Sequence, residues 1–181
     1  MQLGPLPRDA SIDLIRRRIE YFGQTDSYAP VPPRAFEYLY GALHNNLRDA
    51  LAYAQMFADW LYGEYLAEGK DLPPKEDRQG LLEAWLASQS DDAYAVAKVQ
   101  RRVWQFFDDL AQGGGRCGAG EWSEYGFSTQ QQMVRAVTDL VAGNLVVREV
   151  DPDNASRSLA TITPVGWLVY FHRNRYEMSG S

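Results

Sequence analysis

Apolar residues recur every three to four positions through most of the chain up to about residue 143, and this spacing predicts helices. The first half predicts four helices joined by short loops, which is the pattern of a small helical bundle. These helices are expected to begin at Asp9, at the Pro32-Pro33 pair, at Leu47 and at the Pro73-Pro74 pair. Gly23, Asn45 and Gly69 are expected to end the first three.

The polar run Ser88–Asp92 predicts a break in the chain and a domain boundary. We therefore expect a helical bundle over residues 1–90 and a second domain over residues 91–181. The second domain is predicted to open with a helix over Ala93–Gln112. The glycine-rich stretch Gly113–Gly120 is predicted to be a flexible loop.

A further helix is expected after Ser128, which can serve as its N-cap. Its predicted buried side consists of five apolar residues, Met133, Val134, Val137, Leu140 and Val141. After Gly143 the hydrophobic period changes from 3.6 to 2, which predicts two strands, a turn between them and a last helix. These elements are expected at Leu145–Val150, Asp151–Ser156, Ser158–Thr163 and Val165–Tyr176. The whole chain is thus predicted to be mainly α, with a helical bundle followed by a winged helix-turn-helix domain that has a two-stranded wing.

Composition narrows the class of protein. No apolar run approaches the 18 residues of a membrane helix, and the first twenty residues lack the apolar core of a signal peptide, so we expect a cytoplasmic protein without membrane contact. Cys117 is the only cysteine, which excludes an internal disulfide, and His44 and His172 are the only histidines, so no metal site is expected. The net charge of the 181 residues is −6, and all of the acidic excess lies in residues 1–96. Only the neutral C-terminal half is a candidate for contact with DNA.

The stretch from Ser128 to Gly166 resembles the winged-helix core of MarR-like regulators. The resemblance is carried by four features: Ser128 as a cap, Asn144-Leu145-Val146 with Arg148, Asp151-Pro152-Asp153 with Arg157, and Ile162-Thr163 with Gly166. Arg157 lies further past Asp153 than the usual pattern of the wing places its arginine.

This resemblance implies binding of double-stranded DNA by the helix after Ser128 and by the wing. The predicted contact residues are Ser128, Gln131, Gln132, Arg135, Thr138 and Arg157. Glutamine pairs with adenine and arginine with guanine across a major groove, while a wing arginine reaches a phosphate or a minor groove. The alternatives are that these polar residues only solvate a surface helix, or that the wing docks another protein.

Two segments of the N-terminal half, residues 3–19 (LGPLPRDASIDLIRRRI) and residues 44–51 (HNNLRDAL), carry a second resemblance. They are similar to the turn with the first helix and to the start of the third helix in the helical lid of AAA+ ATPases. In this family the third helix carries the sensor-2 arginine, which reaches the γ-phosphate of the nucleotide. By position, Arg48 would be that residue. The alternative is that Arg48 pairs with a neighbouring carboxylate on its own helix.

A lid followed by a winged helix is the C-terminal architecture of origin-recognition-type initiators. The chain contains no phosphate-binding GxxxxGK[ST] motif, so we expect no enzymatic activity and no cofactor in this chain itself. ATP would bind through an ATPase core elsewhere in a longer parent chain, and the expected function is to couple nucleotide state to DNA binding. Two alternatives stay open: a stand-alone MarR-like transcription regulator that forms a homo-oligomer, and a winged helix that docks protein.

Overall fold

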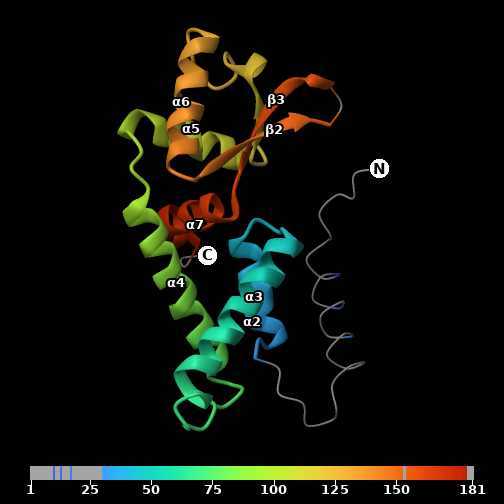
Figure 1. Cartoon of the computed structure of the whole chain (residues 1–181), viewed down its shortest axis with the longest axis vertical. Helices are drawn as coiled ribbons and strands as arrows, with labels where there is room; N and C mark the ends of the chain where they lie inside the picture. The colour runs from blue at the N-terminus through green and yellow to red at the C-terminus, as the bar shows by residue number, and fades with distance from the viewer. Residues whose placement is uncertain (1–9, 11–12, 14–16, 18–29, 153, 179–181) are drawn as a thin grey trace. The chain divides into compact units, whose positions relative to one another are not determined.

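The computed structural model describes residues 10, 13, 17, 30–152 and 154–178 (Figure 1). Across these residues the chain is mainly helical and contains a small antiparallel sheet of three strands. The chain divides into two compact units, residues 1–88 and residues 89–181. The predicted helix from Asp9 to Gly23 lies, apart from residues 10, 13 and 17, outside the described residues.

The first unit contains α2 (Pro33–Ala42), α3 (Leu47–Leu61) and η1 (Tyr62–Leu66), which is a short π-helix, together with the first part of α4 (Arg78–Val96). Helix α2 begins with proline because its fixed φ and missing N–H suit the first helical position. The unit's core is formed by apolar side chains that are fully or almost fully buried: Phe36, Leu39, Tyr40, Leu43, Phe57, Leu61, Leu82 and Leu86. The predicted buried stripe of α2 is thereby confirmed.

The interruption of helical structure predicted at Ser88–Asp92 is wrong, because α4 continues through it to Val96, although the two compact units divide between Ser88 and Gln89. The polar run contains no glycine or proline, and alanines on both sides favour a helix. Ser90, within the run, is fully buried. The chain leaves the helix only at residues 97–100, and α5 (Arg101–Gln112) begins there, eight residues later than predicted.

In the part that the structure describes, the second unit contains the end of α4, α5, three strands, the 3-10 turn η2 and two further helices. After α5 the elements are β1 (Arg116–Gly118), η2 (Ala119–Glu121), α6 (Gln130–Ala142), β2 (Val146–Asp151), β3 (Asn154–Ile162) and α7 (Pro164–Met178). The sheet has the order β1-β3-β2, so β3 is the central strand. No helix within the described ranges has the length and apolar character that crossing a membrane requires.

Strand β1 lies where the sequence predicted a flexible loop. Cys117 pairs with Ala160, and the two flanking residues pair with Thr161 and Leu159 of β3. The sheet therefore has three strands and not the two of the predicted wing. The sequence does not predict this strand, because the glycines before and after Cys117 are as typical of a loop as of a short strand.

The β2–β3 hairpin is longer than predicted. Strand β3 begins at Asn154, which pairs with Asp151, whereas the sequence placed a turn as far as Ser156. The next pair along the ladder is Val150 with Ser158, so the register shifts between these two pairs. Arg157 consequently lies on β3, in this irregular part of the ladder, and not in a loop.

Two glycines permit close approaches in the second unit. A Cβ at Gly166, in the first turn of α7, would collide with the carbonyl oxygen of Leu145 and with the side chain of Ile162. A Cβ at Gly115 would collide with the ring of Trp167. The hydroxyl of Thr163 joins the same elements, since it donates to the carbonyl of Asn144 at 2.7 Å and accepts from the N–H of Gly166 at 2.9 Å. Together these contacts fix the start of α7 against the segment between α6 and β2 and against the segment after α5.

Candidate nucleic-acid interface

Helix α6 begins with a cap that differs from the predicted one. Thr129, not Ser128, is the N-cap residue, and its Oγ1 accepts a hydrogen bond from the N–H of Gln132 at 3.4 Å. The Oε1 of Gln132 in turn accepts from the N–H of Ser128 at 3.1 Å. Both Ser128 and Thr129 suit a cap chemically, and the side chain of Gln132 returns a hydrogen bond to the residue before the cap. One oxygen of a predicted base-reading side chain is therefore used inside the protein.

The buried side of α6 is narrower than predicted. Met133, Val137 and Leu140 are buried, as expected, but Val134 and Val141 are 40% and 39% exposed. Each of these two valines follows a core residue directly, and one step along a helix turns the side chain by about 100°. They lie at the margin of the buried stripe.

Gln131 and Arg135 present the most accessible polar chemistry on α6. Both are exposed, and they are four residues apart, which makes them neighbours on the helix surface. Gln131 is uncharged, and Arg135 takes part in none of the ion pairs found among the described residues. The amide and the guanidinium are thus available to an external partner.

Thr138 and Arg148 connect α6 to β2. The Thr138 hydroxyl donates to the carbonyl of Val134 at 2.8 Å and accepts from Nη2 of Arg148 at 2.7 Å. The same nitrogen of Arg148 lies 3.4 Å from the Val134 carbonyl oxygen. The hydroxyl predicted to face DNA is therefore engaged in holding the helix on the sheet. The sequence identifies Arg148 only as part of a strand motif and does not predict this positioning role.

The hairpin carries both signs of charge. Arg157 is exposed on β3. Glu149 of β2 pairs with Arg116 of β1 at 3.4 Å and accepts a hydrogen bond from Thr161 at 3.0 Å. The Arg116 pair offsets one of the carboxylates that weaken the positive potential at the hairpin.

A groove of about 360 Å³ separates part of α5 from α6. Its lining residues are Arg102, Val103, Phe127, Gln132, Arg135, Ala136 and Asp139. It brings together two predicted contact residues, Gln132 and Arg135, with Arg102 of α5, which the sequence reasoning missed. The available signal was a short basic stretch, Lys98 to Arg102, that contains no carboxylate.

Cys117 lies at a small cavity of about 180 Å³ beneath α6, together with Met133, Val137 and Ala160. The thiol is only 2% exposed. Burial, assisted by the charge of Glu121, raises its pKa to about 12. A thiol with such a pKa stays protonated at neutral pH and is a poor nucleophile. Among the described residues no group of three or more histidine, cysteine or acidic side chains could hold a metal ion.

Arg48 lies in the first turn of α3 and is exposed. Asn46 caps this helix, and its side chain accepts from the N–H groups of Arg48 and Asp49. Burial raises the pKa of Asp49, and the charge of Arg48 lowers it to a smaller extent. The guanidinium of Arg48 makes no ion pair within the described part of the chain. It is therefore accessible to an anion.

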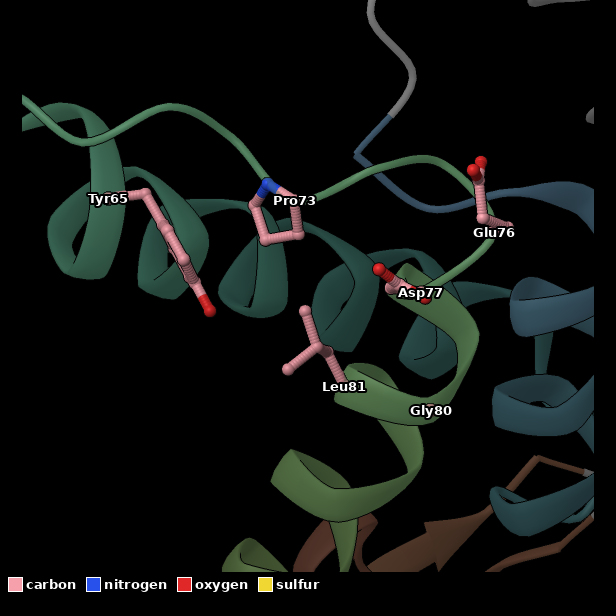
Figure 2. A pocket seen from close by; sticks show the side chains of 6 residues that line it. All are labelled: Tyr65, Pro73, Glu76, Asp77, Gly80 and Leu81. Atoms are coloured by element: carbon pink, nitrogen blue, oxygen red, sulfur yellow. The ribbon is translucent and has the colours of Figure 1, made fainter.

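The first unit also contains a hollow of about 530 Å³ between η1 and the start of α4. Figure 2 shows the side chains of Tyr65, Pro73, Asp77 and Leu81 around it, while Glu76, which also lines it, extends from the loop away from them. The carboxylates repel phosphate groups, so this hollow does not suit a nucleotide or a nucleic acid.

Comparison of the chain with protein-family models, with curated proteins and with solved structures finds no match.

Proposed function

We propose that the second unit is a winged helix that binds double-stranded DNA, with α6 in the major groove and the β2–β3 hairpin as the wing. The observation that carries the proposal is the chain order β1, α6, β2, β3 combined with the sheet order β1-β3-β2. This topology leaves α6 immediately before a two-stranded hairpin, which is the arrangement of the winged helix-turn-helix.

The side chains on α6 support the same proposal. Gln131 and Arg135 are exposed neighbours whose amide and guanidinium match the edges of adenine and guanine in the major groove. Arg157 on β3 supplies a cation to the wing. Thr138 and Arg148 act indirectly in this proposal, because their hydrogen bond holds α6 on β2 in a fixed orientation.

The test is fluorescence anisotropy of the full chain with a labelled random-sequence duplex, measured over a series of salt concentrations. A DNA-binding face loses affinity steeply as salt rises, because bound cations displace counterions from the phosphates. We expect Arg135→Ala and Arg157→Ala each to weaken binding. Arg34→Ala is the matched control, because Arg34 is an exposed arginine of α2 in the other unit. Unchanged affinity in both α6 and wing variants would remove this face from the proposal.

The first unit is proposed to be the lid of an AAA+ ATPase, with Arg48 as its nucleotide sensor. Support comes from the exposed guanidinium of Arg48 in the first turn of α3 and from its lack of an ion pair within the described residues. Arginine suits this role because its planar fork holds phosphate oxygens and stays charged. ATP itself would be held by an ATPase core of the same parent chain.

The lid proposal is tested by the size of the native gene product on an immunoblot. A band well above 20.5 kDa is expected, since the ATPase core must be added to this chain. A band at 20.5 kDa would contradict the lid and favour a stand-alone regulator. That regulator would be a homo-oligomer, and light scattering of the purified chain would detect its dimer.

Docking of a partner protein is the second candidate function. It is favoured by two exposed apolar residues of β2, Val147 and Val150, which are 42% and 66% exposed. Such residues suit a protein surface better than a phosphate backbone. The anisotropy experiment distinguishes the two functions, because a docking wing shows no salt-dependent affinity for DNA.

A further inference from the structure

The groove between α5 and α6 gathers positive charge from two helices. Arg102 is the second residue of α5, while Gln132, Arg135 and Asp139 project from α6. The three α6 residues are spaced by three and four positions, so they lie on one side of that helix. Arg102 and Arg135 are both exposed.

The charges of this groove do not cancel. Neither Arg102 nor Arg135 makes an ion pair within the described residues, and Asp139 is the one carboxylate among the lining side chains. One carboxylate against two guanidiniums leaves a net positive charge. Like charges that line one groove repel each other, and an anion bound between them would remove that repulsion.

The start of α5 adds to the positive potential. Its N-cap, Gln100, makes no side-chain capping bond, so the first N–H groups of the helix are not covered by a side chain. The N-terminal end of a helix carries a partial positive charge. Lys98 and Arg101 lie nearby in sequence, and residues 97–103 contain no acidic side chain.

We infer that this groove holds a phosphate of the DNA backbone, bound by Arg102 of α5, with Arg135 of α6 adding its positive charge to the groove while its guanidinium remains the proposed base contact. The inference rests on the proposed DNA binding by α6 and extends the interface to a second helix. Arginine is suited to this contact because its fork donates two parallel hydrogen bonds to phosphate oxygens. Arg102 then contributes affinity and register but no sequence preference, since phosphates are the same at every base pair.

The experiment is a salt titration of duplex binding by the full chain, for the wild type and for Arg102→Gln, Arg102→Lys and Arg101→Gln. Arg101→Gln is the matched control: it removes the same charge from the adjacent position, but Arg101 lines a different hollow, with Trp104 and Arg173. We expect Arg102→Gln to lower the slope of log affinity against log salt by about one. At 0.15 M salt this corresponds to a loss of about fivefold in affinity, equal for all duplex sequences. Arg102→Lys keeps the charge and is expected to keep most of the slope.

Three other outcomes overturn the inference in different ways. If the wild type shows no salt-dependent binding, the proposed DNA function itself fails and the inference fails with it. If the wild type binds and Arg102→Gln binds equally well with the same slope, only the inference fails. If Arg101→Gln and Arg102→Gln lose the same affinity, the effect is one of net charge and the groove holds no phosphate. Circular dichroism of each variant checks that α5 is intact.

Discussion

Arg173 of α7 grips Asp108 of α5 through two hydrogen bonds. Its Nε donates to Oδ1 at 3.0 Å and its Nη2 to Oδ2 at 2.5 Å. The guanidinium also lies over the ring of Trp104, 4.6 Å from the centroid. The hydrogen bond to Asp108 is the main factor that raises the pKa of Arg173, which further favours the charged form of the guanidinium. This pair therefore connects α5 to α7, two helices that are far apart in the sequence.

We expect Arg173→Ala to lower the free energy of unfolding by about 2 kcal/mol, because it removes a bidentate, charge-assisted pair of hydrogen bonds from a half-buried site. Urea unfolding followed by tryptophan fluorescence measures this change. Arg173→Lys keeps the charge but loses the fork and is expected to show an intermediate loss. An Arg173→Ala variant with an unchanged midpoint would show that the pair contributes nothing net.

Cys117 is expected to be unreactive in the folded protein. With its pKa raised to about 12, about one thiol in 10⁴ is ionised at pH 8, and the burial of the sulfur slows attack further. A thiol-specific disulfide reagent should therefore react slowly in buffer and rapidly in urea. Equal rates in both would contradict the burial of β1.

The same pKa predicts a pH dependence of stability. In the unfolded chain the thiol ionises near its ordinary value of 9.0, whereas the folded chain holds it protonated up to about 12. The stabilisation is therefore fully present below about pH 9 and is lost as the pH rises toward 12. Cys117→Ser should flatten this loss in urea-unfolding curves measured across that interval.

Gly166→Ala is expected to destabilise the second unit by about 3 kcal/mol, because the added methyl group meets the Leu145 backbone, which cannot rotate aside. Thermal unfolding of the full chain measures the loss. Gly120→Ala is the control, since a Cβ there meets nothing within 4 Å. Equal melting temperatures for the two variants would refute the close approach of α7 to Leu145.

Asn46→Ala is expected to cost about 1 kcal/mol through loss of the α3 cap. The Asn46 side chain accepts from the N–H of Arg48 at 3.1 Å and from that of Asp49 at 3.3 Å, and it donates to the Asp49 carboxylate at 2.7 Å. The neighbouring Asn45→Gly serves as control, since Asn45 has a positive φ of 58° that glycine adopts without strain. The two variants are compared by chemical denaturation, where Asn45→Gly should match or exceed the wild type. A midpoint for Asn46→Ala that equals that of Asn45→Gly would show that the cap is dispensable.

Helices with a strong apolar period could be predicted from the sequence. In α2 and at its C-cap the apolar residues follow the helical spacing of three and four positions, and all four of them are buried as expected: Phe36, Leu39, Tyr40 and Leu43. The end of α4 could not be predicted, because Ser88–Asp92 is polar without being incompatible with a helix. Polarity alone does not end a helix when no glycine or proline follows.

The hydrophobic period of the sequence does not predict strands of only a few residues. Strand β1 has three residues, too few to display an alternation, and it exists because β3 offers it a ladder. The first part of β3, with Asn154 and Arg157, has the composition of a turn and is extended by its pairing with β2. Long-range pairing of this kind leaves no local signal.

The candidate interface was predicted in part. The positions of Gln131 and Arg135 on the exposed side of α6 follow from the helical period. Arg102 could not be predicted, since its proximity to Arg135 arises from the packing of α5 against α6. The same holds for the bond between Thr138 and Arg148, which joins residues ten positions apart.

The sheet order described above also bears on self-association. Because β3 is central, the strands at the two edges of the sheet, as formed by the described residues, are β1 and β2. Strand β1 is three residues long, and strand β2 carries the charged residues Arg148, Glu149 and Asp151. Short length and charge both discourage a strand of another molecule from pairing at the edge of a sheet. The hairpin can therefore expose Val147 and Val150 without becoming a template for intermolecular β-aggregation.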